Sequence, residues 1–293
     1  MSVVCAGELL FDQWPDGSAL PGGAPANIAF HVAQTGCAVA LVSRVGNDDD
    51  GERLTAWLGR SGVRDLLQTD FIHPTGRVDV QQTSAGTLYN IHSPAAWDFL
   101  EDDAASGQAA CAADVVVFGT LAQRSPGSRQ TIRQLVGAAR ESGAVSLADL
   151  NLRAPFFDSE TVLWTLRHAD VLKLNAEELC IVSEMLGARG SESALFAGLV
   201  REFALSRAVL TSGNAGAWIW EDGEMSHVAA YSTEVVDTVG AGDAFTAMLT
   251  CGLSRGLSLR ESAPSAARLA AWVVSCRGAT PEWTPEMRSL LDD

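Results

Sequence analysis

Residues 237–245 read Asp-Thr-Val-Gly-Ala-Gly-Asp-Ala-Phe and lead into a predicted helix over 244–253. The first backbone N–H groups of a helix have no partner within it, so this junction suits a phosphate. Gly240 and Gly242 let the backbone approach an anion closely, because neither carries a Cβ. Asp243 would be an ordinary N-cap, or a general base that deprotonates an alcohol attacking the phosphate. The motif alone fits either a capped helix or a phosphoryl-transfer site.

A second glycine-containing turn lies near the start of the chain. Residues 22–30 read Gly-Gly-Ala-Pro-Ala-Asn-Ile-Ala-Phe, and Pro25 stands where the first turn of a helix accepts it. Asn27 adds little to helix stability, so it is a candidate contact for a ligand hydroxyl. Asp12, after the first predicted strand, is a candidate acceptor for sugar hydroxyls, although a solvated loop carboxylate is the commoner case.

Polar side chains also follow later strands. Asp149, Asn151 and Arg153 alternate along an extended stretch, which places them on one side. Asn175 and Glu178 are three residues apart at the start of a helix. They could order the water shell of Mg²⁺ or form a capping box, and their spacing is compatible with both.

The polar turn at 211–216 ends another predicted strand and contains Thr211, Gly213 and Gly216. It could lie under an adenine or a ribose, or be a simple loop.

Composition excludes several classes of protein. The net charge of −16 argues against nucleic acid and anionic membranes as partners. Lys173 is the only lysine and follows Leu172, so no Walker phosphate loop exists, and no Gly-x-Gly-x-x-Gly occurs. The six cysteines are scattered without a Cys-x-x-Cys pair, which favours reduced thiols in a cytoplasmic protein. No stretch resembles a membrane span or a signal peptide.

Apolar runs rich in β-branched residues alternate with amphipathic stretches, which predicts an α/β fold with a central, mainly parallel sheet covered by helices on both faces. We expect strands at 3–6, 38–43, 115–119, 145–150, 171–174 and 208–211, and helices at 51–61, 129–142, 159–168 and 191–203. Ligands bind at the carboxyl ends of such strands, where most of the polar motifs lie.

Residues 70–98 interrupt this alternation. Segments 76–82 and 87–92 alternate around a Thr-Ser-Ala-Gly turn, which predicts a small β-hairpin lid, with residues 10–20 as a candidate addition. A second pair, 217–221 and 225–231, is expected to extend the main sheet. With no linker in the sequence, we expect one domain over 1–293.

Together these segments resemble the ribokinase-like carbohydrate kinase family over nearly the whole chain. Residues 22–30 are similar to its N-terminal Gly-Gly signature, and 237–245 to its specific Asp-Thr-x-Gly-Ala-Gly-Asp signature. Residues 173–178 are similar to its Asn-x-x-Glu element, and 278–281 to its C-terminal turn. The resemblance implies ATP-dependent phosphorylation of a sugar hydroxyl.

Residue roles follow from that resemblance. It implies Asp243 as general base and the N–H groups of Gly240, Ala241 and Gly242 as the anion hole. The remaining implied roles are sugar binding by Asp12, Gly23 and Asn27, organisation of Mg²⁺ by Asn175 and Glu178, nucleotide contacts at Thr211, Gly213 and Gly216, and a monovalent cation such as K⁺ at Asp237.

The acceptor sugar is narrowed by details of the sequence. The form of 22–27 and of 149–153 resembles fructokinases, and the short segment between Glu8 and Gly22 leaves little room for a two-stranded N-terminal lid segment. Residues 1–43 contain no lysine or arginine, which disfavours a sugar phosphate. In the unusual segment 89–98, Tyr89, Ile91 and Trp97 are candidate walls of the sugar site.

Other acceptors remain open. A 2-keto-3-deoxygluconate kinase would need a cation for the carboxylate, which Arg153 or Arg77 could supply, and ribose or a nucleoside are further alternatives. A non-catalytic sensor of sugar or nucleotide is a remote alternative, because Asp243 and Glu178 are both present. An exposed lid could pair two copies into a homodimer.

Overall fold

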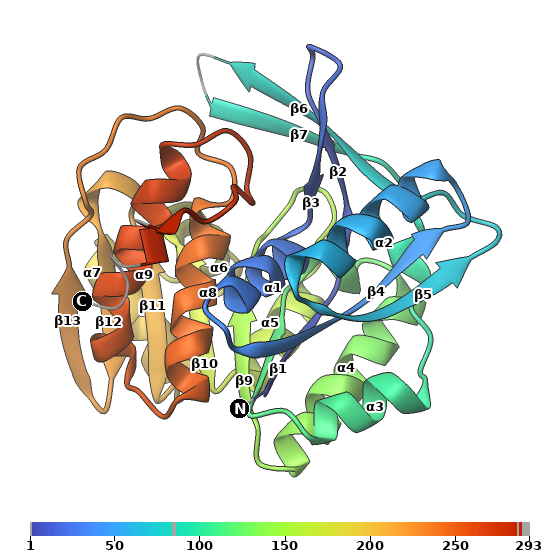
Figure 1. Ribbon diagram of the computed structural model, residues 1–293. Coiled ribbons are helices and arrows are strands. Elements are labelled where there is room, and N and C mark those ends of the chain that lie inside the picture. The colour runs from blue at the N-terminus through green and yellow to red at the C-terminus, as the bar shows by residue number, and fades with distance from the viewer. Residues whose placement is uncertain (1, 84–85, 286, 289–293) are drawn as a thin grey trace.

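The computed structural model describes residues 2–83, 86–285 and 287–288, and within them the main sheet has nine strands (Figure 1). In spatial order they are β13 (Glu224–Val228), β12 (Ala217–Glu221), β11 (Arg207–Thr211), β10 (Val171–Asn175), β9 (Val145–Asp149), β8 (Val115–Phe118), β1 (Ser2–Ala6), β4 (Ala38–Gly46) and β5 (Arg64–Asp70). The seven strands from β11 to β5 are parallel, and β12 and β13 are antiparallel. The predicted parallel sheet and its antiparallel extension are confirmed.

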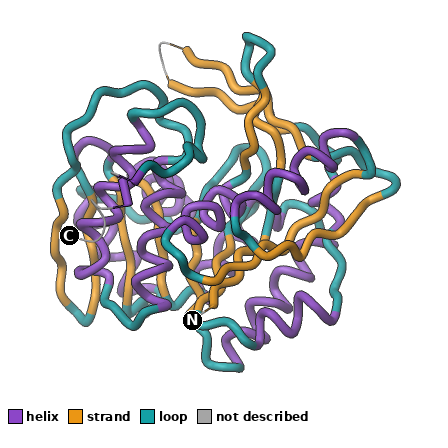
Figure 2. Tube along the Cα trace, in the orientation of Figure 1, coloured by secondary structure: helices purple, strands orange, loops and turns teal. Residues whose placement is uncertain are grey.

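Helices cover both faces of this sheet, as Figure 2 shows. Val4 and Ala6 of β1 face one apolar core, and Val3 and Cys5 face the other, as expected for a central strand buried on both sides. The first core is closed by α3 (Ala104–Cys111), α4 (Pro126–Glu141), α5 (Ser159–His168), α6 (Ala176–Met185) and α7 (Glu192–Glu202). The second is closed by α1 (Ala24–Gln34), α2 (Asp49–Ser61), α8 (Ala241–Ser254) and α9 (Leu259–Val274). None of the helices in the described ranges has the length and apolar character that a membrane crossing requires.

A second sheet of four strands stands at the top of the view in Figure 1, on the side where β1 ends. Its order is β3 (Ala19–Gly22), β2 (Leu10–Gln13), β6 (Gly76–Thr83) and β7 (Gly86–Ile91). The predicted hairpin is therefore present as β6 and β7, while Ser84 and Ala85 of its turn lie outside the described residues. The expectation of little room for a two-stranded N-terminal segment was wrong. β2 and β3 have only four residues each and pair antiparallel across a short turn, so both fit in this segment. The parallel pairing of β2 with β6 joins them to the hairpin.

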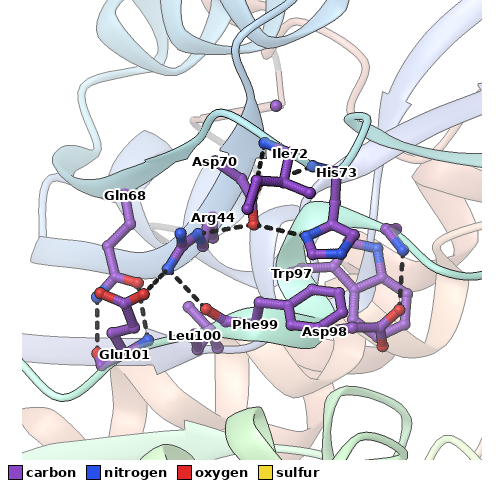
Figure 3. A network of polar contacts seen from close by, with 12 residues as sticks. Arg44, Gln68, Asp70, Ile72, His73, Trp97, Asp98, Phe99, Leu100 and Glu101 are labelled. Atoms are coloured by element: carbon purple, nitrogen blue, oxygen red, sulfur yellow. Dashed lines mark hydrogen bonds and ion pairs between the residues drawn. The ribbon is translucent and has the colours of Figure 1, made fainter.

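A polar network anchors the chain where it passes from the main sheet to the second sheet (Figure 3). Arg44, at the end of β4, contacts the buried Asp70 of β5 at 3.1 Å and donates to the carbonyl of Phe99 at 2.8 Å. Asp70 also contacts the ring of His73 at 3.1 Å, and that ring stacks on Phe99 with centroids 3.6 Å apart. Phe99 ends the 3₁₀ turn η1 (Ala96–Phe99), so the network fixes both chain segments that flank β6 and β7.

Candidate active site

A cavity of about 200 Å³ is enclosed by the carboxyl ends of main-sheet strands and the inner face of the second sheet. It brings together residues that are widely separated in the sequence. The predicted site residues that line it are Asp12, Gly23, Asn27, Tyr89, Ile91, Arg153, Asn175, Thr211, Gly240, Gly242 and Asp243. Glu8, Lys173 and Asn151 also line it. Most of the predicted site is therefore gathered around one space.

The start of α8 forms one wall of this cavity. Gly240 is its N-cap with φ 81°, and a Cβ there would lie 2.5 Å from backbone Cα of Ala279, so only glycine fits. A Cβ on Gly242 would lie 2.9 Å from the ammonium nitrogen of Lys173. The first-turn N–H groups of this helix have no intrahelical partner, and the helix dipole adds positive potential. A wall of this kind can hold an anion.

Asp243 lies in the first turn of α8 and faces Asn27 of α1. The amide nitrogen of Asn27 donates to Oδ2 of Asp243 at 2.8 Å, across more than two hundred residues of sequence. Burial raises the pKa of Asp243, and the nearby Asp149 carboxylate adds to that shift, while the hydrogen bond from Asn27 opposes it. The carboxylate is thus oriented by an amide, and its burial makes it a stronger base than a solvated carboxylate.

Lys173 places a cation beside the glycine turn at residues 240–242, and its sequence context did not point to the site. Its Nζ lies 3.0 and 3.1 Å from the two carboxylate oxygens of Asp149, and Oγ1 of Thr246 donates to Asp149 at 2.7 Å. Burial opposes the charge of Lys173, but the carboxylates of Asp149, Glu178 and Asp243 outweigh it, so the pKa of Lys173 is raised. The signal available in the sequence was a sole lysine near the end of a buried strand.

Two further carboxylates, Glu8 and Asp12, face the cavity from the segment after β1. Burial raises the pKa of Glu8 to about 7, and burial together with the charge of Asp243 raises that of Asp12 to about 7. Glu8 accepts the N–H of Ala24 at 3.3 Å, which gives α1 a capping acceptor from outside the helix. Gly23, with φ 102°, leaves no room for a Cβ against the Glu8 carbonyl. Gly22 and Gly23 therefore pack directly on Asp12 and Glu8.

Arg153, which follows β9 of the main sheet, meets Tyr89 of β7 in the second sheet at one side of the cavity. The guanidinium of Arg153 lies 5.1 Å from the ring centroid of Tyr89 and donates to the side chain of Asn151 at 3.2 Å. Asn151 has φ 45°, a left-handed conformation that turns the chain after β9. Burial raises the pKa of the Tyr89 hydroxyl to about 12, so that hydroxyl stays protonated and available as a donor.

Asn175 and Glu178 form a complete capping box at the start of α6. Oδ1 of Asn175 accepts the N–H of Glu178 at 2.9 Å, and Oε2 of Glu178 accepts the N–H of Asn175 at 2.8 Å. The other oxygen of Glu178 accepts the N–H of Leu152 at 3.0 Å. Asn175 lines the cavity, whereas the buried Glu178 lies behind it. The structure shows the capping box, and the role of the pair toward Mg²⁺ stays a prediction.

Asp237 fastens the glycine turn to the C-terminal turn. Its two oxygens accept the N–H of Val239 at 3.1 Å and of Gly278 at 2.9 Å. The next carbonyl, of Ala279, accepts from Nε2 of the buried His31 at 2.9 Å. These contacts hold residues 278–279 against Gly240. The carboxylate of Asp237 therefore supports the glycine turn at 240–242 whether or not a cation binds beside it.

Six predicted site residues do not line the cavity: Glu178 and Asp237, described above, and Trp97, Gly213, Gly216 and Ala241. Trp97 is fully buried in the core, where Arg124 stacks on its ring at 3.9 Å, so the expectation that it forms a wall of the sugar site was wrong. Its place in an apolar segment beside Tyr89 did not distinguish a cavity wall from a core residue. Gly213 and Gly216 lie in the 3₁₀ turn and its cap, η3 (Gly213–Ala215), beyond Thr211, and Ala241 contributes backbone to α8. Their predicted nucleotide and anion contacts stay predictions.

Comparison with known proteins identifies the family. The sequence model described as the pfkB family carbohydrate kinase matches residues 13–286, which is most of the chain. The chain belongs to the pfkB family of carbohydrate kinases. It is 31% identical to the fructokinase of Escherichia coli over 93% of each chain. This pfkB kinase therefore transfers a phosphoryl group from ATP to a carbohydrate hydroxyl, as predicted.

Solved structures agree with that assignment. The fold of this pfkB kinase matches a fructokinase from Xylella fastidiosa with bound ATP, with a TM-score of 0.86 and 22% identity over 99% of this chain and 97% of that one. It also matches a fructokinase from Vibrio cholerae in a fructose, ADP and calcium ion bound form, with a TM-score of 0.81 and 26% identity over 95% and 94%. The ribokinase-like fold expected from the sequence is confirmed.

Proposed function

We propose that this pfkB kinase phosphorylates an uncharged ketose, most specifically fructose, with Asp243 as the general base. The observation that carries the proposal is the geometry of Asp243: a buried carboxylate, oriented by Asn27 at 2.8 Å, at the start of a helix whose first residues line the same cavity. The similarity to fructokinases over nearly the whole chain supports the choice of sugar.

Each step of the transfer has a group to perform it. ATP, when bound, supplies the phosphoryl group. Asp243 takes the proton of the attacking sugar hydroxyl at its carboxylate, which the hydrogen bond from Asn27 holds in place. The N–H groups of 240–242 and the ammonium of Lys173 stabilise negative charge that grows on the transferred group, because they are fixed before the reaction. The second sheet then acts as a lid that excludes water from the cavity.

Charge at the cavity favours a neutral acceptor. Glu8, Asp12 and Asp243 all face it, whereas Lys173 is already paired with Asp149. Arg153 is the remaining cation among the described lining residues. A sugar acid or a sugar phosphate would meet more negative than positive charge there. Hydroxyl groups, in contrast, can donate to a carboxylate or accept from a protonated carboxyl group, and with the pKa values of Glu8 and Asp12 raised to about 7 both forms occur here. A neutral polyhydroxy sugar therefore matches the lining best.

Water molecules would hold Mg²⁺ at this site, and backbone carbonyl groups would hold K⁺. Both oxygens of Glu178 already accept backbone N–H groups, so Mg²⁺ would be held with its own water molecules and with Asn175 as the nearest side chain. When bound, the ion supplies positive charge to the phosphates. Asp237 and the carbonyl groups around 276–279 are the candidate ligands of K⁺. Removal of K⁺ is then expected to lower kcat, because a positive charge beside residues 240–242 is lost, although Asp237 still holds the turn through its two backbone hydrogen bonds.

The acceptor is tested with purified protein, ATP and Mg²⁺ in a coupled assay that follows ADP release. The panel contains fructose, ribose, adenosine and 2-keto-3-deoxygluconate. We expect the highest kcat/KM for fructose, and a higher KM for the sugar acid because of the acidic lining. A higher kcat/KM for the nucleoside or the sugar acid would overturn the choice of substrate while leaving the kinase assignment intact.

A further inference from the structure

Two of the six cysteines, Cys37 and Cys251, meet where the end of α1 packs on the last turn of α8. The hydroxyl of Thr35, which caps α1, lies 3.1 Å from Sγ of Cys251. Gly36, with φ 79°, then turns the chain, and Sγ of Cys37 lies 4.0 Å from the hydroxyl of Ser254. Cys251 and Ser254 are three residues apart on α8 and share a face of that helix. The contacts therefore place the two sulfur atoms at one junction.

The two thiols have opposite environments. Cys37 is partly exposed, and Cys251 is buried. The Nη2 of Arg255 donates to the carbonyl of Thr35 at 3.1 Å, which brings a guanidinium to the same junction. Hydrogen bonding from the Cys251 thiol, aided by Thr35, Arg255 and Ser254, lowers the pKa of Cys37 to about 5. The same contact raises the pKa of Cys251, which burial raises further. One thiol is poised as a reachable thiolate and the other as its protonated neighbour.

We propose that Cys37 and Cys251 form a redox-active pair, in which a peroxide oxidises Cys37 and Cys251 then closes a disulfide that joins α1 to α8. Nothing in the catalytic cavity takes part: the pair lies at the opposite end of α1 from Asn27. The proposal does not depend on which sugar the kinase uses.

The chemistry balances with hydrogen peroxide as the oxidant. The thiolate of Cys37 attacks one peroxide oxygen, the O–O bond breaks, and the leaving hydroxide takes up a proton as water, which leaves a sulfenic acid on Cys37. Cys251 then loses its proton and attacks Sγ of Cys37. The S–S bond forms, and the sulfenic oxygen departs as a second water molecule. Two thiols are oxidised and one peroxide is reduced.

The bond would connect two helices that both begin at the active site. α1 carries Asn27 in its first turns and α8 carries Asp243, and these side chains hydrogen-bond to each other. A covalent link between positions so far apart in the sequence restricts the unfolded chain strongly. Oxidised protein should therefore melt at a higher temperature than reduced protein, and a reducing agent should reverse the shift.

The test uses the full-length, fully reduced protein, treated with a small excess of hydrogen peroxide and then alkylated. We expect free thiols to fall from six to four, a cross-linked peptide pair containing residues 37 and 251, and full reversal with dithiothreitol. In Cys37→Ser the bond cannot form. In Cys251→Ala, Cys37 should remain as a sulfenic acid that dimedone traps. Cys111→Ser and Cys180→Ser, which alter exposed cysteines elsewhere, should behave as wild type.

Alkylation rates give a second test, which uses the wild-type protein and so does not require any variant to fold. In the reduced wild-type protein at pH 7, iodoacetamide should alkylate Cys37 about tenfold faster than Cys111 or Cys180, because a larger fraction of it is thiolate. Faster reaction at the two exposed cysteines would overturn the proposal. So would peroxide treatment that yields sulfonic acids, or disulfides between other cysteines, with no link between residues 37 and 251.

Discussion

Lys173→Met removes the cation beside the glycine turn at 240–242. It tests quantitatively how much the ammonium of Lys173 stabilises negative charge at that turn. The ammonium lies 2.9 Å from the position of a Cβ on Gly242, and we take roughly 4 Å as its distance from a phosphate held by that turn. At an effective dielectric constant of about 20, two unit charges at that distance interact by about 4 kcal/mol. Asp149 cancels part of this field. We therefore expect a loss of about 2 to 3 kcal/mol of transition-state stabilisation, or roughly 100-fold in kcat.

The same change also affects folding, because it leaves Asp149 buried without its partner. Removing one member of a buried ion pair costs about 3 to 5 kcal/mol. Lys173→Met/Asp149→Asn separates the two effects: an asparagine can still accept from Thr246 but carries no charge. It should recover most of the free energy of unfolding, measured by urea denaturation, while kcat stays low.

Steady-state ADP release at saturating ATP and sugar gives kcat for both variants, with Lys173→Arg as the matched control that keeps the charge. Lys173→Arg should retain more activity than Lys173→Met, although its larger head group will not reproduce the wild-type value. A folded Lys173→Met protein with kcat within threefold of wild type would refute the electrostatic role.

Three further outcomes are expected. The pKa of Glu8 is raised to about 7, so the folded protein keeps a proton that the unfolded chain releases near pH 4.5. The free energy of unfolding should therefore fall as the pH rises from about 4.5 to 7. Glu8→Gln should reduce this fall by about 3 kcal/mol, measured by urea denaturation at pH 5 and pH 8. Gly242→Ala should lower kcat by about 10- to 100-fold with the fold intact, because its Cβ displaces the ammonium of Lys173. Trp283→Phe should lower the free energy of unfolding by about 1 to 3 kcal/mol, because Nδ1 of the buried His31 loses its donor at 3.0 Å.

Each of these has a result that contradicts it. An unchanged pH dependence in Glu8→Gln would show that the carboxyl group is ionised in the folded state. A wild-type kcat in Gly242→Ala would mean that the ammonium can move aside at no cost. Wild-type stability in Trp283→Phe would mean that water replaces the indole donor.

The main sheet was predictable because its signal is local. Strands such as β8, Val115–Phe118, are short apolar runs between polar or glycine-bearing turns, and a strand buried on both faces tends to be continuous in apolar residues. The extension formed by β12 and β13 followed from the Asp-Gly turn at 222–223. Helix starts were less accurate: α4 begins at Pro126, three residues before the predicted start, because its first turn contains proline, glycine and serine and so lacks apolar residues at helical spacing.

The N-terminal part of the second sheet was harder to predict because its strands depend on a distant partner. β2 has four residues, and it is a strand because it pairs with β6 some sixty residues later. Sequence alone shows neither that pairing nor the register.

Site residues could be predicted from the sequence where their type was unusual for the local structure. They could not be predicted where their properties depend on burial in the folded protein. Asp243 and Asn27 stood out as polar residues at helix starts. Glu8 and Lys173 did not, because their roles come from the elements that surround them rather than from their neighbours in sequence. Trp97 was misplaced for the same reason: only packing decides whether an aromatic side chain lines a cavity or fills the core.

The central claim is that Asp243 removes the proton from the sugar hydroxyl, and Asp243→Asn tests it most directly. Asparagine keeps the size of the side chain and can still accept from Asn27, so thermal stabilisation by ATP and by sugar should persist. With the base removed, kcat measured by ADP release should fall about 10²- to 10⁴-fold. A variant that binds both substrates and retains kcat within tenfold of wild type would contradict the account.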